Sequence, residues 1–122
     1  MMNYKFKTQK LDIEKSIYYF IELDNEKYYS LGRLSESNWT PEKAQELLDE
    51  IELSREKEKE DEYIWANEDV TLYSNKHGVF LIDEIAIRYG ERDSEKIGLE
   101  LSHDDFILFM KDFKSFIEEN TN

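Results

Sequence analysis

The stretch from residue 38 to residue 62 constrains the fold most, because a well-marked helix start is followed there by the densest run of acid in the chain. Thr40 can cap a helix with its hydroxyl, and Pro41 suits the first helical position. Trp39, just before the cap, is placed to pack on Ala44 as a hydrophobic staple. The sequence therefore predicts a helix that begins at Pro41.

This helix is predicted to be amphipathic. Its apolar residues recur at helical spacing and form one stripe: Ala44, Leu47, Leu48 and Ile51. The acidic residues occupy other parts of its surface: Glu42, Glu46, Asp49, Glu50 and Glu52. After Leu53 the apolar period stops, and residues 54–62 read SREKEKEDE, which is too charged to be covered by an apolar surface. We expect one buried face and a strongly acidic surface beside it.

The charge of the chain is unevenly distributed along its 122 residues. Residues 1–40 contain six acidic and six basic side chains, which cancel, whereas residues 41–122 contain 23 acidic and 10 basic ones. The later part therefore carries the whole net charge of −13. Such a field repels nucleic acid and anionic membranes and attracts basic surfaces. We expect a basic protein partner, no direct nucleic-acid binding and no membrane binding.

Composition indicates a folded intracellular protein. A chain of this length with 39% hydrophobic residues can bury a core as one domain, which we expect to span residues 1–122. The absence of cysteine excludes disulfides and thiolate sites and fits a reducing compartment. The first ten residues lack the apolar segment of a signal peptide, and no run is long enough to cross a bilayer. We expect a cytoplasmic location.

Alternating apolar residues predict strands on both sides of the helix. Before it, we expect an edge strand at 4–13, a central strand at 16–23, a turn at 24–27 and a third strand at 28–34 with Gly32 at a bulge. After it, residues 63–65 are expected to dock on the body, and strands are expected at 70–73 and 79–82, joined by a loop at 74–78. Residues 85–89 are expected to extend the second of these past a bulge or exposed edge at 83–84, and a loop at 91–96 to precede a short strand at 97–101.

The last part of the chain predicts a second amphipathic helix. Ser102 can cap it, with Asp105 in the answering position of a capping box. Its apolar stripe, which Ile107 and Leu108 broaden, consists of Phe106, Phe109, Met110, Phe113, Phe116 and Ile117. The element order is then β-β-β-α-β-β-β-α. We predict an α+β fold, with a single antiparallel sheet of about five to six strands and two helices packed on one face.

Catalytic and metal-binding interpretations find little support. His103 could join Asp104 and Asp105 around a metal, but adjacent helical residues point about 100° apart, so a charged helix start is the favoured interpretation. Asp83–Glu84 and Glu68–Asp69 could act as paired carboxylates only if one were buried with a raised pKa. The chain has no glycine-rich phosphate loop and no Ser-His-Asp pattern. We predict no catalytic site, metal, cofactor or small-molecule ligand.

The acidic stretch after the helix is the remaining functional candidate. A charge run is usually a solvated face, and that interpretation stays open. Aromatic residues set among acids also suit a protein-binding surface, because rings can be desolvated anchors while carboxylates pair with Lys and Arg. The predicted partner-binding residues are Glu58, Glu60, Asp61, Glu62, Tyr63, Trp65, Glu68, Asp69, Asp83 and Glu84.

Several segments together resemble the small acidic immunity proteins of bacterial contact-dependent and other polymorphic toxin systems. They are YYFIELDNEKYYSLGRL (residues 18–34), the helix TPEKAQELLDEIE, NEDV (67–70) and the final helix LSHDDFILFMKDFKSFIE. The resemblance implies a cytoplasmic, non-catalytic protein that neutralises one toxin, often a basic nuclease, by covering its active site. Such families share no fixed binding motif, so it implies no particular site residue.

Three other interpretations stay open from the sequence. A nucleic-acid mimic or anti-defence inhibitor would occupy a nucleic-acid-binding groove and carry carboxylates at phosphate-like intervals. An acidic protein-binding domain of another kind would share the charge but not the toxin partner. A small enzyme would need a closed pocket that holds perturbed carboxylates.

Overall fold

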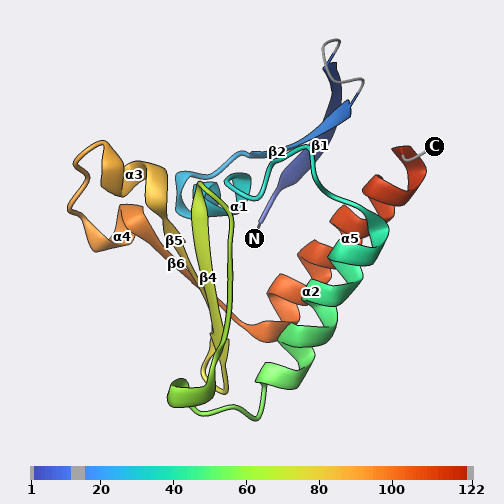
Figure 1. Cartoon of the computed structure of the whole chain (residues 1–122). Coiled ribbons are helices and arrows are strands. Elements are labelled where there is room, and N and C mark those ends of the chain that lie inside the picture. Colours follow the sequence, from blue (N-terminus) through green and yellow to red (C-terminus); the bar gives the residue numbers. More distant parts are fainter. Residues whose placement is uncertain (1, 12–15, 121–122) are drawn as a thin grey trace.

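The strands form two separate antiparallel sheets in an α+β arrangement (Figure 1). The computed structural model describes residues 2–11 and 16–120. The first sheet is a two-stranded ribbon of β1 (Tyr4–Leu11) and β2 (Ser16–Leu23). The second sheet follows chain order and comprises β3 (Tyr63–Ala66), β4 (Val70–Asn75), β5 (Gly78–Asp83) and β6 (Gly98–Leu101).

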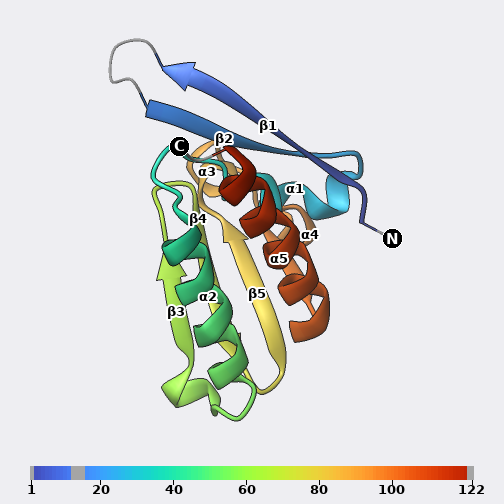
Figure 2. The same cartoon turned by 90° about the vertical axis from the view of Figure 1, so that its right-hand side faces the viewer.

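Two long helices, α2 (Pro41–Ser54) and α5 (His103–Asn120), lie side by side on one face of the four-stranded sheet (Figures 1 and 2). Their predicted starts are confirmed. Thr40 Oγ1 accepts the Lys43 N–H at 3.1 Å, and Ser102 Oγ accepts the Asp105 N–H at 3.0 Å. The other helical segments are short: η1 (Glu26–Tyr28), α1 (Tyr29–Gly32), η2 (Lys59–Asp61), α3 (Glu84–Arg88) and α4 (Ser94–Ile97).

The main core lies between the two long helices and the sheet. The helices contribute the stripes expected from their spacing: Ala44, Leu47, Leu48, Ile51, Phe106, Ile107, Phe109, Met110, Phe113 and Ile117. The sheet contributes alternate residues of its strands: Val70, Leu72, Val79, Leu81, Leu99 and Leu101. The predicted broadening of the stripe at Leu108 is wrong, because that side chain is 61% exposed. Trp39 is buried in the same core as Ala44.

The β1–β2 ribbon lies across the end of the helical layer, as Figure 2 shows. Phe6 packs on Phe113 with ring centroids 5.2 Å apart, which joins the ribbon to α5. The predicted strand at 4–13 is confirmed as far as Leu11, and residues 12 and 13 lie outside the described residues. The strand at 16–23 is also confirmed. Its predicted place in the middle of a sheet is wrong, because β1 is the strand that pairs with β2 among the described residues, apart from an isolated bridge between Tyr19 and Glu36.

The prediction of a third strand at 28–34 is wrong, and with it the prediction of one sheet. Asn25 Oδ1 accepts the Lys27 N–H at 3.0 Å and starts a helical turn instead of a hairpin. Leu31 and Leu34 are both buried, which is the three-residue spacing of a tight helix and not the two-residue spacing of a strand. Gly32 is no bulge: a Cβ there would lie 3.3 Å from the Ile21 oxygen, so glycine lets α1 approach β2 closely.

The prediction that residues 85–89 extend a strand is also wrong. Asp83 Oδ1 accepts the Ala86 N–H at 3.0 Å and caps α3, so the chain turns into a helix where a bulge or exposed edge was expected. The predicted loop at 91–96 contains the start of α4, capped by Asp93. Ile97 ends that helix, so the predicted strand at 97–101 begins at Gly98. The loop at 74–78 shortens to a tight turn, since β4 continues to Asn75.

Candidate partner-binding site

A groove of about 650 Å³ lies where β3, the beginning of α2 and the segment after α1 meet. One side is lined by the inward-facing side chains of β3, and the other by the first turns of α2. The β3–β4 turn also contributes to the lining. The residues that line it are Tyr18, Ser35, Glu36, Ser37, Asn38, Trp39, Lys43, Glu46, Leu47, Tyr63, Trp65, Ala66, Asn67, Glu68 and Asp69.

Two stacked tryptophans form the apolar part of the groove. Trp39 and Trp65 have ring centroids 5.6 Å apart and an interplanar angle of 19°. Trp39 is held in place, because its Nε1–H donates to the Leu34 oxygen at 2.7 Å and its ring packs edge-on against Phe113. Trp65 is half-buried against this support and leaves part of its ring to the groove. The arrangement suits an aromatic anchor with little freedom to lose on binding.

Asn67 fixes the turn that ends the groove. Its Oδ1 accepts the N–H groups of Asp69 and Val70 at 2.8 Å and 2.9 Å, which is an Asx turn. Its Nδ2 donates to the Arg33 oxygen at 3.1 Å and to Glu36 Oε2 at 3.0 Å. One amide therefore ties the β3–β4 turn to the segment after α1 and holds two groove carboxylates, Glu36 and Asp69, on neighbouring loops.

The groove is electrostatically negative. Four carboxylates line it and are opposed there by the ammonium group of Lys43: Glu36, Glu46, Glu68 and Asp69. Burial, followed by the charges of Asp69 and Glu36, raises the pKa of the Tyr18 hydroxyl. Burial, followed by the charges of Glu50 and Glu46, raises the pKa of the Tyr63 hydroxyl. Both phenols therefore stay neutral at physiological pH, and the negative charge comes from carboxylates that can meet a cation.

Removing the carboxylates beside Tyr63 is expected to lower the pKa of its hydroxyl. In Glu46→Gln with Glu50→Gln, the phenolate meets less repulsion, so ultraviolet titration should show ionisation at lower pH than in the unmodified chain. The pKa should stay above the ordinary tyrosine value, because burial is the larger cause. Glu95→Gln, on the exposed surface of α4, is the matched control and should leave the titration unchanged. An unaltered Tyr63 titration in the double variant would contradict the negative field of the groove.

The structure brings four of the predicted partner-binding residues together in this groove: Tyr63, Trp65, Glu68 and Asp69. The acidic tract that precedes β3 lies at the opposite end of that strand from the β3–β4 turn (Figure 2). Within it, Glu58 pairs with Lys76 at 2.9 Å, and Glu62 accepts a hydrogen bond from Asn75 Nδ2 at 2.9 Å. Glu60 and Asp61 are exposed on η2.

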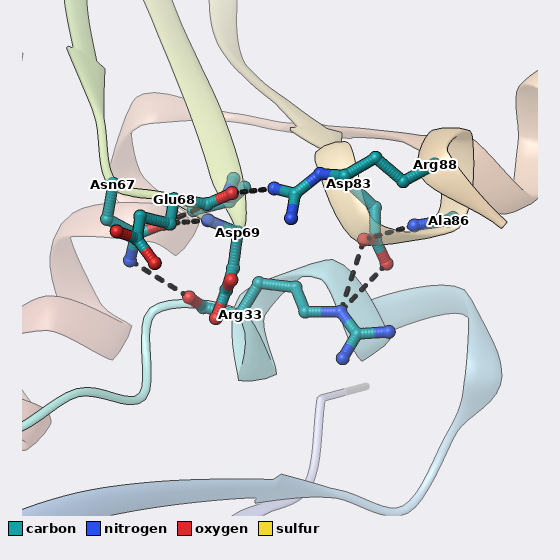
Figure 3. A network of polar contacts seen from close by, with 8 residues as sticks. Arg33, Asn67, Glu68, Asp69, Asp83, Ala86 and Arg88 are labelled. Atoms are coloured by element: carbon teal, nitrogen blue, oxygen red, sulfur yellow. Dashed lines mark hydrogen bonds and ion pairs between the residues drawn. The ribbon is translucent and has the colours of Figure 1, made fainter.

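Asp83 and Glu84 lie outside the groove lining and serve internal contacts, and Figure 3 shows those of Asp83 with Arg33 and Ala86. Asp83 is 4% exposed, and both of its carboxylate oxygens accept from Arg33 Nε at 3.1 Å. Glu84 Oε1 accepts from the hydroxyl of Thr71 at 3.1 Å. The main chains of the two predicted acidic pairs do meet, because the Glu84 N–H donates to the Asp69 oxygen at 2.9 Å. The carboxylates of Asp83 and Glu84 nevertheless take separate partners, Arg33 and Thr71.

The groove also contains residues that were not predicted to bind a partner, chiefly Tyr18, Trp39, Glu46 and Asn67. A signal for Glu46 was present, because it lies directly beside the apolar stripe of α2. A signal for Asn67 was also present, because an Asn followed two residues later by another polar residue in NEDV favours an Asx turn. Tyr18 carried no such signal, because it reaches the groove from β2, far away in the sequence.

The histidine beside two aspartates serves the structure of the helix start. His103 Nε2 makes a hydrogen bond with the Asn75 oxygen at 2.7 Å, while Arg55 contacts Asp104 at 2.7 Å and holds the pKa of that carboxyl below its usual range. Within residues 2–11 and 16–120, no group of three or more metal-ligating side chains is placed to hold an ion. In the same residues, no helix is long and apolar enough to span a membrane.

The chain matches no protein-family model, no curated protein and no solved structure.

Proposed function

We propose that this chain is a non-catalytic inhibitor of the immunity or antitoxin type, which binds and neutralises a basic toxin domain in the cytoplasm. The groove between β3 and α2 is the proposed binding surface. The observation that carries the proposal is the placement of four carboxylates around the half-buried ring of Trp65, in a groove open to solvent. A basic nuclease is the proposed class of toxin, because its own active site must attract phosphates.

Most of the acidic side chains that the structure describes form no internal ion pair. Of the 29 acidic residues, 27 lie among the described residues, and seven of these 27 form an ion pair: Glu22, Glu52, Glu58, Asp83, Glu91, Asp104 and Glu118. None of these seven lines the groove. The groove carboxylates are therefore not neutralised by internal salt bridges, and they can pair with Lys and Arg of another protein.

The groove and the acidic tract have different roles in this proposal. Exposed carboxylates such as Glu60 and Asp61 attract a basic partner over a distance of about a Debye length and speed its encounter. Trp65 and Tyr63 then offer ring faces to guanidinium or ammonium groups as these lose water, which is a cation–π contact. Inhibition follows because the bound chain covers the basic surface that a nuclease needs for its substrate.

Charge reversal in the groove is expected to abolish tight binding. We expect the gene immediately upstream to encode the toxic partner domain. In Glu46→Lys with Glu68→Lys, two contacts that would attract this domain become repulsive, so its affinity should fall about 100-fold or more. Isothermal titration with a catalytically inactive form of that domain measures the change. Growth protection in cells that express the active domain should be lost in parallel.

The matched control is Glu26→Lys with Glu95→Lys, which makes the same change in net charge on exposed residues away from the groove. It should retain protection and lose affinity only slightly, through weaker long-range attraction. Equal losses in both double variants would show that total charge matters and the groove does not. Tight binding to unrelated DNA-binding proteins would instead support a nucleic-acid mimic, and no binding to the upstream domain would oppose the proposed function.

A further inference from the structure

β3 lies at the edge of the four-stranded sheet, and one side of its main chain has no strand partner among the residues that the structure describes. The Asn67 N–H donates to the Val70 oxygen at 3.1 Å, and the same register pairs Trp65 with Leu72. Hydrogen-bonded and non-bonded pairs alternate in an antiparallel ladder, so Trp65 bonds to β4 while Ile64 and Ala66 direct their N–H and C=O groups away from the sheet. Figure 2 shows β3 at the border of the sheet, beside α2, and β4 is its one strand neighbour among the described residues.

This edge lacks the usual protection of an exposed strand. Natural edge strands carry charged side chains that discourage a further strand from pairing. β1 carries Lys5, Lys7 and Lys10, and the other edge of the large sheet, β6, carries Glu100. β3 reads YIWA and contains no charge, and its Ile64 side chain is 57% exposed. Acidic residues flank the strand on both sides but leave the strand itself open.

We propose that an extended segment of the basic partner adds to the edge of β3 as an antiparallel strand, with basic and apolar residues in alternation. This inference rests on the proposed function and specifies its mode of binding. Side chains opposite Tyr63 and Trp65 would enter the acidic groove, so these positions require Lys or Arg. Side chains opposite Ile64 and Ala66 would lie on the other face of the sheet beside exposed apolar groups, so these positions require apolar residues.

Charge complementarity selects a basic strand over a second copy of this chain. An antiparallel pair of two β3 strands would place Glu62 of each copy near the Glu68 and Asp69 turn of the other. Like charges placed opposite each other across a strand pair are destabilising. A segment rich in Lys or Arg meets the same carboxylates with opposite sign, so the edge admits that partner and repels its own copy.

The direct test uses a synthetic probe, the peptide Ac-(Lys-Val)4-NH2, and NMR hydrogen exchange of the unmodified chain at low salt. The peptide should bind and slow exchange of the Ile64 and Ala66 amides by at least about tenfold, because these N–H groups become hydrogen-bonded. Methylating the backbone nitrogens of the valines should weaken binding by about tenfold, since those N–H groups face β3. Methylating the backbone nitrogens of the lysines should not weaken binding, because those N–H groups point away from β3. Equal affinities of the three peptides, or no binding of the parent peptide, would overturn strand addition.

A variant of the chain provides the complementary test. Ala66→Pro removes one N–H from the free edge and leaves the ladder with β4 intact, because proline is tolerated where an edge N–H faces solvent. It should lower peptide affinity about tenfold, whereas Glu100→Pro makes the same backbone change at the opposite edge and should not. If Ala66→Pro alters the fold, the methylated peptides decide alone. The upstream domain could also bind the groove while the Ile64 and Ala66 amides at the edge of β3 remain unprotected from hydrogen exchange. That result would refute strand addition but leave the proposed function standing.

Discussion

Replacing Arg33 with methionine is expected to destabilise the fold by about 3 kcal/mol, because it leaves the buried carboxylate of Asp83 without its ionic partner. Arg33 Nε donates to both oxygens of Asp83 at 3.1 Å, and the Asp83 side chain is 5% exposed. In the variant, the carboxylate would keep the Ala86 N–H as a partner but lose the charge that balances it. Urea denaturation at neutral pH measures the difference.

The control for this prediction is the same substitution in a chain that carries Asp83→Asn. Asparagine is neutral and its Oδ1 can still cap α3, so the loss of Arg33 leaves no buried charge behind. Arg33→Met should then cost no more than about 1 kcal/mol, close to the worth of an ordinary hydrogen bond. If the two costs were equal, Arg33 would act through packing alone, and the ion pair between the α1 segment and the sheet would have no energetic role.

Replacing Gly78 with alanine is expected to lower the free energy of unfolding by about 2–4 kcal/mol. Gly78 closes the tight turn between β4 and β5 with φ 135°, a conformation that side chains rarely adopt. A Cβ at this position would also lie 2.8 Å from the Leu101 oxygen, which belongs to the backbone of β6. The side chain must therefore push β6 away from β5 or strain the turn.

Gly90 provides a matched comparison, because it has φ 88° and a Cβ at this position would have no atom of the described residues within 4 Å. Gly90→Ala should cost about 1 kcal/mol, from backbone strain alone. Denaturation midpoints of the two variants separate strain from steric overlap. Equal losses in the two variants would mean that the contact between Gly78 and β6 adds nothing.

The two long helices could be predicted from the sequence because each has both a cap and a sustained apolar period. Thr40 and Ser102 mark where the helices begin, and several turns of regular spacing follow each of them. The run at 28–34 offers neither length nor a clear period, so its apolar residues fit a strand as well as a helix. The Asn25 cap decides between them in the folded chain, and it selects a helical turn.

Only part of the candidate site was predictable, for a similar reason. Tyr63, Trp65 and the Glu68–Asp69 pair are neighbours in the sequence, so their mixture of rings and acids was visible there. Tyr18 and Glu46 reach the groove from β2 and α2, which the sequence alone does not bring together. Asp83 was taken for a surface residue because its partner Arg33 lies 50 residues away.

The most direct test of the proposed binding surface is a two-dimensional NMR titration of the labelled chain with the inactive domain encoded upstream. We expect the largest shifts at the Trp65 indole N–H and at the backbone amides that line the groove, from Glu46 and from residues 63–69. We expect small shifts on the β1–β2 ribbon, which lies outside that lining except at Tyr18. Binding that shifts the ribbon and leaves the groove unchanged would contradict the groove as the place where the partner binds.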